Sequence, residues 1–194
     1  MENKEHVLLC VMGRTSSGKD SLVSRLCDRA RVKQIISYAT RPRRTNEGDT
    51  HIFTTKETYE QMKAEGNVAA YTEIDGNFYW TTVDQLYEND IYIIDPLGVK
   101  TLKDLNLPNL RLVTVYINTP DKIREDRAIN RRGDDKLRFR TRNLSEAHQF
   151  RDMLKNAEFD YSVANVDFAK AYSVLKWICN VEGLWKNEVE DTTK

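Results

Sequence analysis

Short runs of apolar residues alternate with amphipathic stretches along most of the chain. Strands are predicted at residues 7–12, 91–94, 112–117 and 159–164. Leu22, Val23 and Leu26 share one face of a predicted helix at residues 21–30. Further helices are predicted from residue 121, at 135–156 and at 166–179. This alternation predicts an α/β fold in which helices wrap a parallel sheet.

The alternation breaks down between residues 41 and 82. A short strand is predicted within residues 32–38, and a polar loop follows it. Capping-box spacing predicts helix starts near Thr54 and Thr82, and a turn at residues 75–77 predicts a hairpin. We interpret this stretch as an insert that forms a separate flap over the first loop of the core.

Composition narrows the classes of function. The 194 residues include 30 basic and 30 acidic side chains, and this zero net charge argues against nucleic acid or an anionic membrane as a partner. Phosphate binding must therefore come from locally placed arginines, which gather at residues 41–44 and 124–142. Cys10, Cys27 and Cys179 lie in apolar runs and are expected to be reduced core residues. With no signal peptide or membrane span in view, we expect a cytoplasmic protein.

The first strand runs directly into a phosphate loop. Gly13 and Gly18 bracket four residues before Lys19, the spacing at which backbone N–H groups surround a polyphosphate at the positive end of a helix. Lys19 is expected to reach the β- and γ-phosphate oxygens of ATP. The alternative is a plain turn between a strand and a helix. The ATP-binding residues predicted here are Gly13, Ser16, Ser17, Gly18, Lys19, Asp20 and Ser21.

The residue after the lysine is unusual. A Ser or Thr that holds Mg²⁺ is expected there, but the chain has Asp20 and places the hydroxyl at Ser21. The carboxylate could meet Mg²⁺ through water, or repel phosphate without a metal. We favour the first, because Lys19 and Mg²⁺ would screen it. Asp95 ends a predicted strand, where ligands gather in open α/β sheets, and completes the predicted Mg²⁺ set with Asp20 and Ser21.

Five segments in matching order resemble the guanylate kinase family. The first is the phosphate loop. Residues 37–44, followed by Glu47, His51 and Phe53, resemble the segment in which a serine and two arginines bind the phosphate of the acceptor nucleotide. Residues 76–81 resemble the Gly-Asn-Tyr-Tyr turn of the family, and residues 94–99 resemble its acidic strand end. Residues 158–161, leading to Asn165, are similar to its last strand.

The resemblance implies a P-loop three-layer α/β/α fold with a parallel core sheet. It implies one domain over residues 1–194, with a core (1–36, 88–123 and 143–186), an acceptor-binding flap (37–87) and an arginine-rich lid (about 124–142). It adds Asn165 to the ATP-binding residues and implies catalytic roles for Lys19, Arg131, Arg132 and Arg142. The implied acceptor-binding residues are Ser37, Arg41, Arg44, His51, Tyr79, Thr81 and Asp95.

The activity implied is ATP- and Mg²⁺-dependent phosphorylation of a nucleoside monophosphate, with GMP or dGMP as the leading acceptor. The partners would be nucleotides, with no nucleic acid or membrane, and the chain would be a monomer or homodimer. For Arg41 to Arg44 the alternative is a solvated loop, and for each lid arginine it is an exposed helix face paired with a carboxylate such as Asp126 or Asp134.

Base recognition departs from the family pattern. This chain has Ala70 at the position where the family has a glutamate that hydrogen-bonds the guanine edge. It has Trp80 in place of a family glycine and Ile93 in place of an acidic residue. We expect Trp80 to fill space near the base, and base specificity to be altered while phosphate contacts persist. Two further readings therefore stay open: a kinase of this fold for another nucleotide or a phosphosugar, and a noncatalytic binding module.

Overall fold

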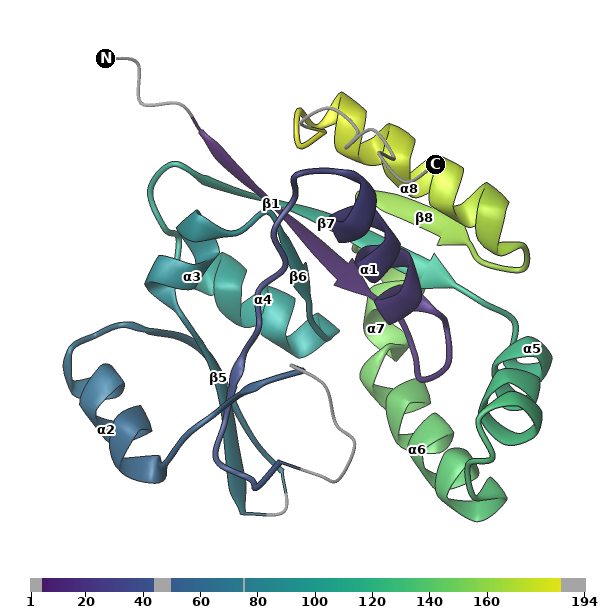
Figure 1. Ribbon diagram of the computed structural model, residues 1–194, viewed down its shortest axis with the longest axis horizontal. Coiled ribbons are helices and arrows are strands. Elements are labelled where there is room, and N and C mark those ends of the chain that lie inside the picture. Colours follow the sequence, from purple (N-terminus) through teal and green to yellow (C-terminus); the bar gives the residue numbers. More distant parts are fainter. Residues whose placement is uncertain (1–4, 44–49, 75, 186–194) are drawn as a thin grey trace, which may run out of the picture.

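The computed structural model describes residues 5–43, 50–74 and 76–185. Its core is a four-stranded parallel sheet in the order β6–β1–β7–β8 (Figure 1). The strands are β1 (His6–Met12), β6 (Ile91–Ile93), β7 (Leu110–Asn118) and β8 (Tyr161–Ala164). Because parallel strands share one direction, their carboxyl ends lead into the same edge of the sheet, where ligands of open α/β sheets bind.

Helices cover both faces of this sheet. Leu9 and Val11 of β1 pack with α1 (Lys19–Arg29) and α8 (Phe168–Val181). Leu8, Cys10 and Met12 point the other way, toward the second apolar cluster. That cluster includes side chains from α3 (Val83–Glu88), α4 (Pro96–Asp104) and α7 (Arg151–Asn156). Successive side chains of β1 thus point to opposite faces of the sheet, and each face packs against its own layer of helices. This arrangement confirms the predicted three-layer α/β/α fold.

A second sheet lies beside the core, in the order β3–β2–β5–β4 (Figure 1). Its strands are β2 (Tyr38–Ala39), β3 (Ile52–Phe53), β4 (Val68–Ile74) and β5 (Asn77–Thr82). The predicted hairpin is the antiparallel pair β4–β5. Both predicted helix starts form: Thr55 caps α2 (Lys56–Ala64), and Thr82 and Gln85 make a reciprocal capping box at α3.

Two sequence predictions in this region are corrected. The strand predicted within residues 32–38 is reduced to one bridge between Gln34 and Ile91, because the chain leaves the core sheet there to enter β2. Trp80 packs against Tyr38 and Tyr59, with ring centroids 5.1 and 5.2 Å away, and its Nε1–H donates to the Sδ of Met62. It faces α2, on the opposite face of β5 from Tyr79 and Thr81, and so does not lie where we expected a base.

The arginine-rich segment forms three consecutive helical pieces: α5 (Asp121–Asp126), the π-helix η1 (Arg127–Arg131) and α6 (Lys136–Gln149). The long helix predicted at residues 135–156 is divided between α6 and α7 at Phe150, which is buried beside Tyr116. Short π-helical segments such as η1, inserted between α-helices, are frequent at functional sites. In Figure 1 the second sheet lies to the left of the phosphate loop, α5 lies to its right and α6 lies below it.

The three cysteines are free thiols. Burial raises the pKa of Cys10 to about 12, and burial likewise raises the pKa of Cys27 and Cys179. They remain protonated near neutral pH and act as small apolar residues. Across the part of the chain that the structure describes, no helix has the length and apolar character needed to cross a membrane.

Candidate active site

Two glycines shape the phosphate loop between β1 and α1. A Cβ on Gly13 would lie 2.6 Å from the Oγ of Ser17, and a Cβ on Gly18 would lie 2.5 Å from the Nδ2 of Asn165. Gly18 also begins α1 at φ +84°, in the left-handed region that favours glycine. The loop therefore needs glycine at both positions for its compact curve.

The loop is held from beneath through one carbonyl. Ser17 O accepts from Asn165 Nδ2 at 2.7 Å, from Thr119 Oγ1 at 2.9 Å and from Arg127 Nη1 at 3.0 Å. These partners follow β8 and β7 or lie in η1, so three elements fix one peptide. Asn165 was predicted to bind ATP. It is 1% exposed and lies under the loop, where its contact is with the protein backbone.

The outer half of the loop is tied to the arginine-rich helices. Arg124 is 1% exposed and donates to the carbonyls of Thr15 (3.1 Å) and Thr119 (3.2 Å) and to the carboxylate of Asp121 (2.7 Å). The hydrogen bond from Arg124 lowers the pKa of Asp121. Arg14 reaches α6, where its Nη2 donates to the backbone O and side-chain Oδ1 of Asn143.

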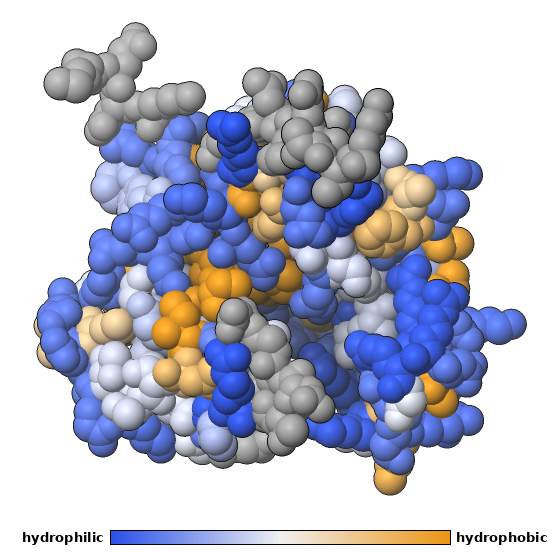
Figure 2. Space-filling view, viewed as in Figure 1, coloured by the Kyte–Doolittle hydropathy of each residue, from blue (hydrophilic) through white to orange (hydrophobic). Residues whose placement is uncertain are grey.

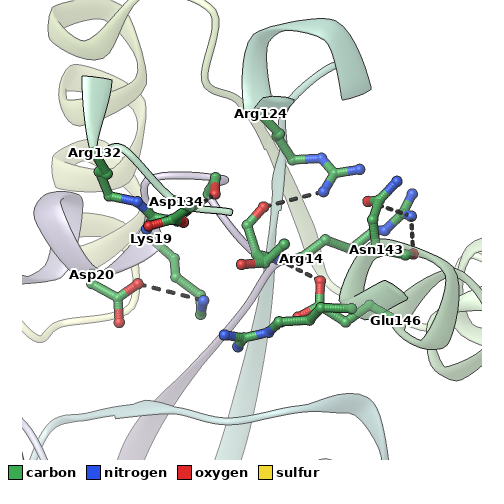
Figure 3. A network of polar contacts seen from close by, with 11 residues as sticks. Arg14, Lys19, Asp20, Arg124, Arg132, Asp134, Asn143 and Glu146 are labelled. Atoms are coloured by element: carbon green, nitrogen blue, oxygen red, sulfur yellow. Dashed lines mark hydrogen bonds and ion pairs between the residues drawn. The ribbon is translucent and has the colours of Figure 1, made fainter. Parts of the chain in front are cut away.

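The side chains of Lys19, Asp20 and Arg132 lie at the mouth of the loop (Figure 3). The Nζ of Lys19 lies 3.4 Å from the Oδ2 of Asp20, whose side chain is 75% exposed. Arg132 donates to the Oγ of Ser16 at 3.0 Å and also pairs with Asp134. The loop thus has two cations and one accessible carboxylate beside its backbone amides.

The other two predicted catalytic arginines differ in their surroundings. Arg142 donates from Nε to the Oε1 of Glu146 at 3.0 Å, and the Oε2 of Glu146 accepts the backbone N–H of Thr15 at 2.5 Å. The carboxylate of Glu146 therefore bridges Arg142 and the phosphate loop. Arg131 is 69% exposed and pairs with Asp126 at 3.3 Å.

Two cavities flank Phe168 next to the loop. One, of about 460 Å³, contains Asp20 and Ser21 among its lining residues. The other, of about 420 Å³, is lined by Arg127, Arg131, Val166 and residues of α5. Phe168 is 42% exposed and Val166 is 59% exposed. Partly exposed apolar side chains beside guanidinium groups form the kind of surface on which planar rings can stack.

Four predicted acceptor residues gather at the second sheet. The Oγ of Ser37 lies 3.1 Å from the Nδ1 of His51, and the His51 ring makes an edge contact with Tyr79 at 5.6 Å. His51 also contacts Phe53, and the Cζ of Arg41 lies 5.1 Å from the centre of that Phe53 ring. Arg44 lies outside the described residues. In Figure 2 the surface is hollowed between this sheet and α6, and the α6 side is largely hydrophilic.

Thr81 and Asp95 have protein partners of their own. Thr81 is fully buried, and its Oγ1 donates to the phenol oxygen of Tyr92 at 2.6 Å. Burial raises the pKa of Tyr92 to about 12, so this phenol stays protonated. The Oδ1 of Asp95 accepts the backbone N–H of Gly98 at 2.7 Å and caps α4. Ala70 is 8% exposed and packs in the same apolar cluster as Tyr92.

Sequence reasoning did not find Arg14, Arg124, Arg127, Asn143 or Glu146. Arg124 and Arg127 fell inside the segment that we predicted as an arginine-rich lid over the phosphates, whereas their partners are loop carbonyls and Asn165 O. The spacing of Asn143 and Glu146, three residues apart on a helix, could have suggested a shared face. No sequence signal showed that this face meets the loop.

The phosphate loop, the inserted sheet with its arginine and histidine, and the arginine-rich helices on the other side together define a P-loop nucleoside monophosphate kinase. The family model for guanylate kinase matches residues 5–182, and the chain belongs to the guanylate kinase family.

Sequence and structural similarity to individual guanylate kinases supports this assignment. A guanylate kinase of Vibrio parahaemolyticus is 28% identical over 188 residues, which cover 91% of this chain and 88% of that protein. One from Syntrophotalea carbinolica is 30% identical over 186 residues, with coverage of 91% and 86%. The crystal structure of a guanylate kinase from Anaplasma phagocytophilum shares the fold, with a TM-score of 0.63, 20% identity and coverage of 92% and 87%.

Proposed function

We propose that this protein transfers the γ-phosphoryl group of ATP to a nucleoside monophosphate, with GMP or dGMP as the acceptor. An oxygen of the acceptor phosphate attacks the γ-phosphorus, the bond to the β-phosphate oxygen breaks, and ADP and a nucleoside diphosphate leave. Family membership supports the activity. The observation that carries the proposal is the pairing of a glycine-shaped loop that holds Lys19 with a second group of donors, Ser37, Arg41 and His51, gathered around Phe53 on the second sheet.

The chemistry needs positive charge around both phosphates and exclusion of water more than covalent help from the protein. We propose that loop amides and Lys19 bind the ATP phosphates, while Arg41, Ser37, His51 and Tyr79 bind the acceptor phosphate. Arg132 and Arg142 would stabilise the charge on the group in transfer. Closure of the flap (37–87) and lid (about 124–142) would exclude water.

Mg²⁺ fits the residues at the loop. Asp20 offers an exposed carboxylate beside Lys19, and Ser21 lines the same cavity. Proteins commonly hold Mg²⁺ through one or two carboxylates together with substrate phosphates and water, so no larger protein cage is required. Bound there, the ion would neutralise phosphate charge. Asp95 is the weaker part of the predicted set, because its carboxylate already caps α4.

The choice of base is less constrained, and one observation favours a second candidate acceptor. Ala70 packs among apolar side chains and has no group that can bond a base edge, and Thr81 is committed to Tyr92. A site with fewer unpaired polar groups discriminates less between bases. Another nucleoside monophosphate is therefore the second candidate.

A panel assay tests both candidates. Purified protein is incubated with ATP, Mg²⁺ and each of GMP, dGMP, AMP, CMP, UMP and dTMP, and ADP formation is followed. We expect GMP or dGMP to give the highest kcat/KM, with a preference over AMP of about tenfold to a hundredfold, since Ala70 cannot supply the strong discrimination of a buried polar contact. Equal turnover of all six nucleoside monophosphates would indicate that the protein recognises its acceptor through the phosphate group and not through the base. No turnover by protein shown to bind ATP would refute the proposal.

A further inference from the structure

Helix α6 presents a small polar face to the phosphate loop. Asn143 and Glu146 lie three residues apart, on the same side of the helix. Asn143 accepts two hydrogen bonds from Arg14, and Glu146 accepts the backbone N–H of Thr15, so two successive loop residues contact this face (Figure 3). The contact joins α6 directly to the loop that is to hold ATP.

Glu146 uses its two oxygens for different elements. Oε2 accepts the Thr15 amide at 2.5 Å and Oε1 accepts the Nε–H of Arg142 at 3.0 Å. Its side chain is 13% exposed, whereas that of Arg142 is 65% exposed. The carboxylate is thus held on the loop, while the guanidinium that it binds projects into the open space beside the loop.

We propose that Glu146 is a positioning residue, which acts through Arg142 by setting its guanidinium group beside the phosphate loop. This inference rests on the proposed phosphoryl transfer. It assigns to Glu146 the task of linking loop and arginine, so that the cation is in place when the two phosphates meet.

The physical need for such a link follows from the freedom of arginine. An exposed arginine has a long side chain with many rotamers, and it loses that rotamer entropy when it is fixed in one geometry. A carboxylate that is itself anchored to a backbone amide restricts that freedom before substrate arrives. A misplacement of about 1 Å in a positioned group can cost on the order of a hundredfold in rate.

The test compares Glu146→Ala with wild type in the acceptor assay. We expect kcat to fall about tenfold to a hundredfold, with the KM for ATP and for the acceptor changed by less than about threefold. The matched control is Glu5→Ala. Glu5 also pairs with an arginine, Arg111 at 3.0 Å, but both side chains are well exposed and lie outside the lid and the phosphate loop. We expect its kcat to stay within about twofold of wild type.

A double-mutant cycle separates positioning from a structural role. In an Arg142→Ala background, Glu146→Ala should change kcat by less than about twofold, because the group through which it acts is gone. Full additivity of the two losses, or an unchanged kcat in the single variant, would overturn the inference. Thermal unfolding of each variant shows whether it is folded.

A second readout does not depend on turnover. The ¹H–¹⁵N signal of the Arg142 Nε–H should exchange slowly with solvent in wild type and quickly in Glu146→Ala. The same exchange rate in both proteins would overturn the inference even if no acceptor were phosphorylated. Failure of the proposed function would appear differently, as wild-type protein that turns over no nucleoside monophosphate.

Discussion

Lys19→Met is expected to lower kcat about a hundredfold to a thousandfold. The substitution keeps an unbranched apolar side chain and removes only the ammonium group that lies at the mouth of the loop, 3.4 Å from Asp20. A preorganised cation or donor aimed at developing charge contributes on this scale when it is removed. Steady-state kinetics with saturating ATP and acceptor measure the change.

The control for this variant is Lys155→Met, on the exposed surface of α7. It makes the same chemical change far from any predicted site, and its kcat should remain within about twofold of wild type. The ion-pair partner of Lys19, Asp20, has a side chain that is 75% exposed, so this pair adds little to folding stability and Lys19→Met should unfold within a few degrees of wild type. A catalytically normal Lys19→Met enzyme would exclude the role assigned to Lys19, whereas wild-type protein without any turnover would favour the noncatalytic binding module.

Arg41→Ala is expected to raise the KM for the acceptor about tenfold to a hundredfold and to leave the KM for ATP nearly unchanged. A charge-assisted hydrogen bond contributes about 1.5–3 kcal/mol, and each 1.4 kcal/mol is a factor of ten in affinity. The Arg41 guanidinium already lies over the Phe53 ring, which in turn contacts His51, so its position is partly set before the acceptor binds.

Arg43→Ala supplies the matched comparison. Its guanidinium also stacks on Phe53, with Cζ 5.0 Å from the ring centre, but its side chain is more exposed than that of Arg41. We expect the KM for the acceptor to change by less than about threefold. Equal effects of the two substitutions would mean that the arginines of this loop contribute general positive charge, and that the Arg41 guanidinium makes no specific bidentate contact with the acceptor phosphate.

The parts of the molecule that were predictable from sequence are those encoded locally. Consecutive apolar residues located the core strands, the capping residues located α2 and α3, and glycine spacing located the phosphate loop. The gathering of Ser37, Arg41 and His51 was foreseen through the family resemblance, because those residues are close in sequence and flank two adjacent short strands, β2 and β3.

The features that could not be predicted from the sequence depend on contacts between residues that are far apart along the chain. Thr15 and Glu146 are 131 positions apart, and no local pattern shows that α6 meets the loop. Trp80 was misplaced because the sequence did not show which face of β5 would pack on α2. Arg124 was assigned to the lid, and nothing in the sequence indicated its burial because arginine is seldom buried, yet three acceptors, two of them loop or strand-end carbonyls, surround its guanidinium.

The central claim is that the phosphate loop and the Arg41 cluster hold two phosphates end to end. A bisubstrate compound, adenosine and guanosine joined through five phosphates, tests it by isothermal titration calorimetry. If both sites bind one molecule, its Kd should be at least about a hundredfold lower than that of ATP, and Lys19→Met and Arg41→Ala should each weaken it. Binding no tighter than that of ATP, and unaffected by Arg41→Ala, would contradict the account.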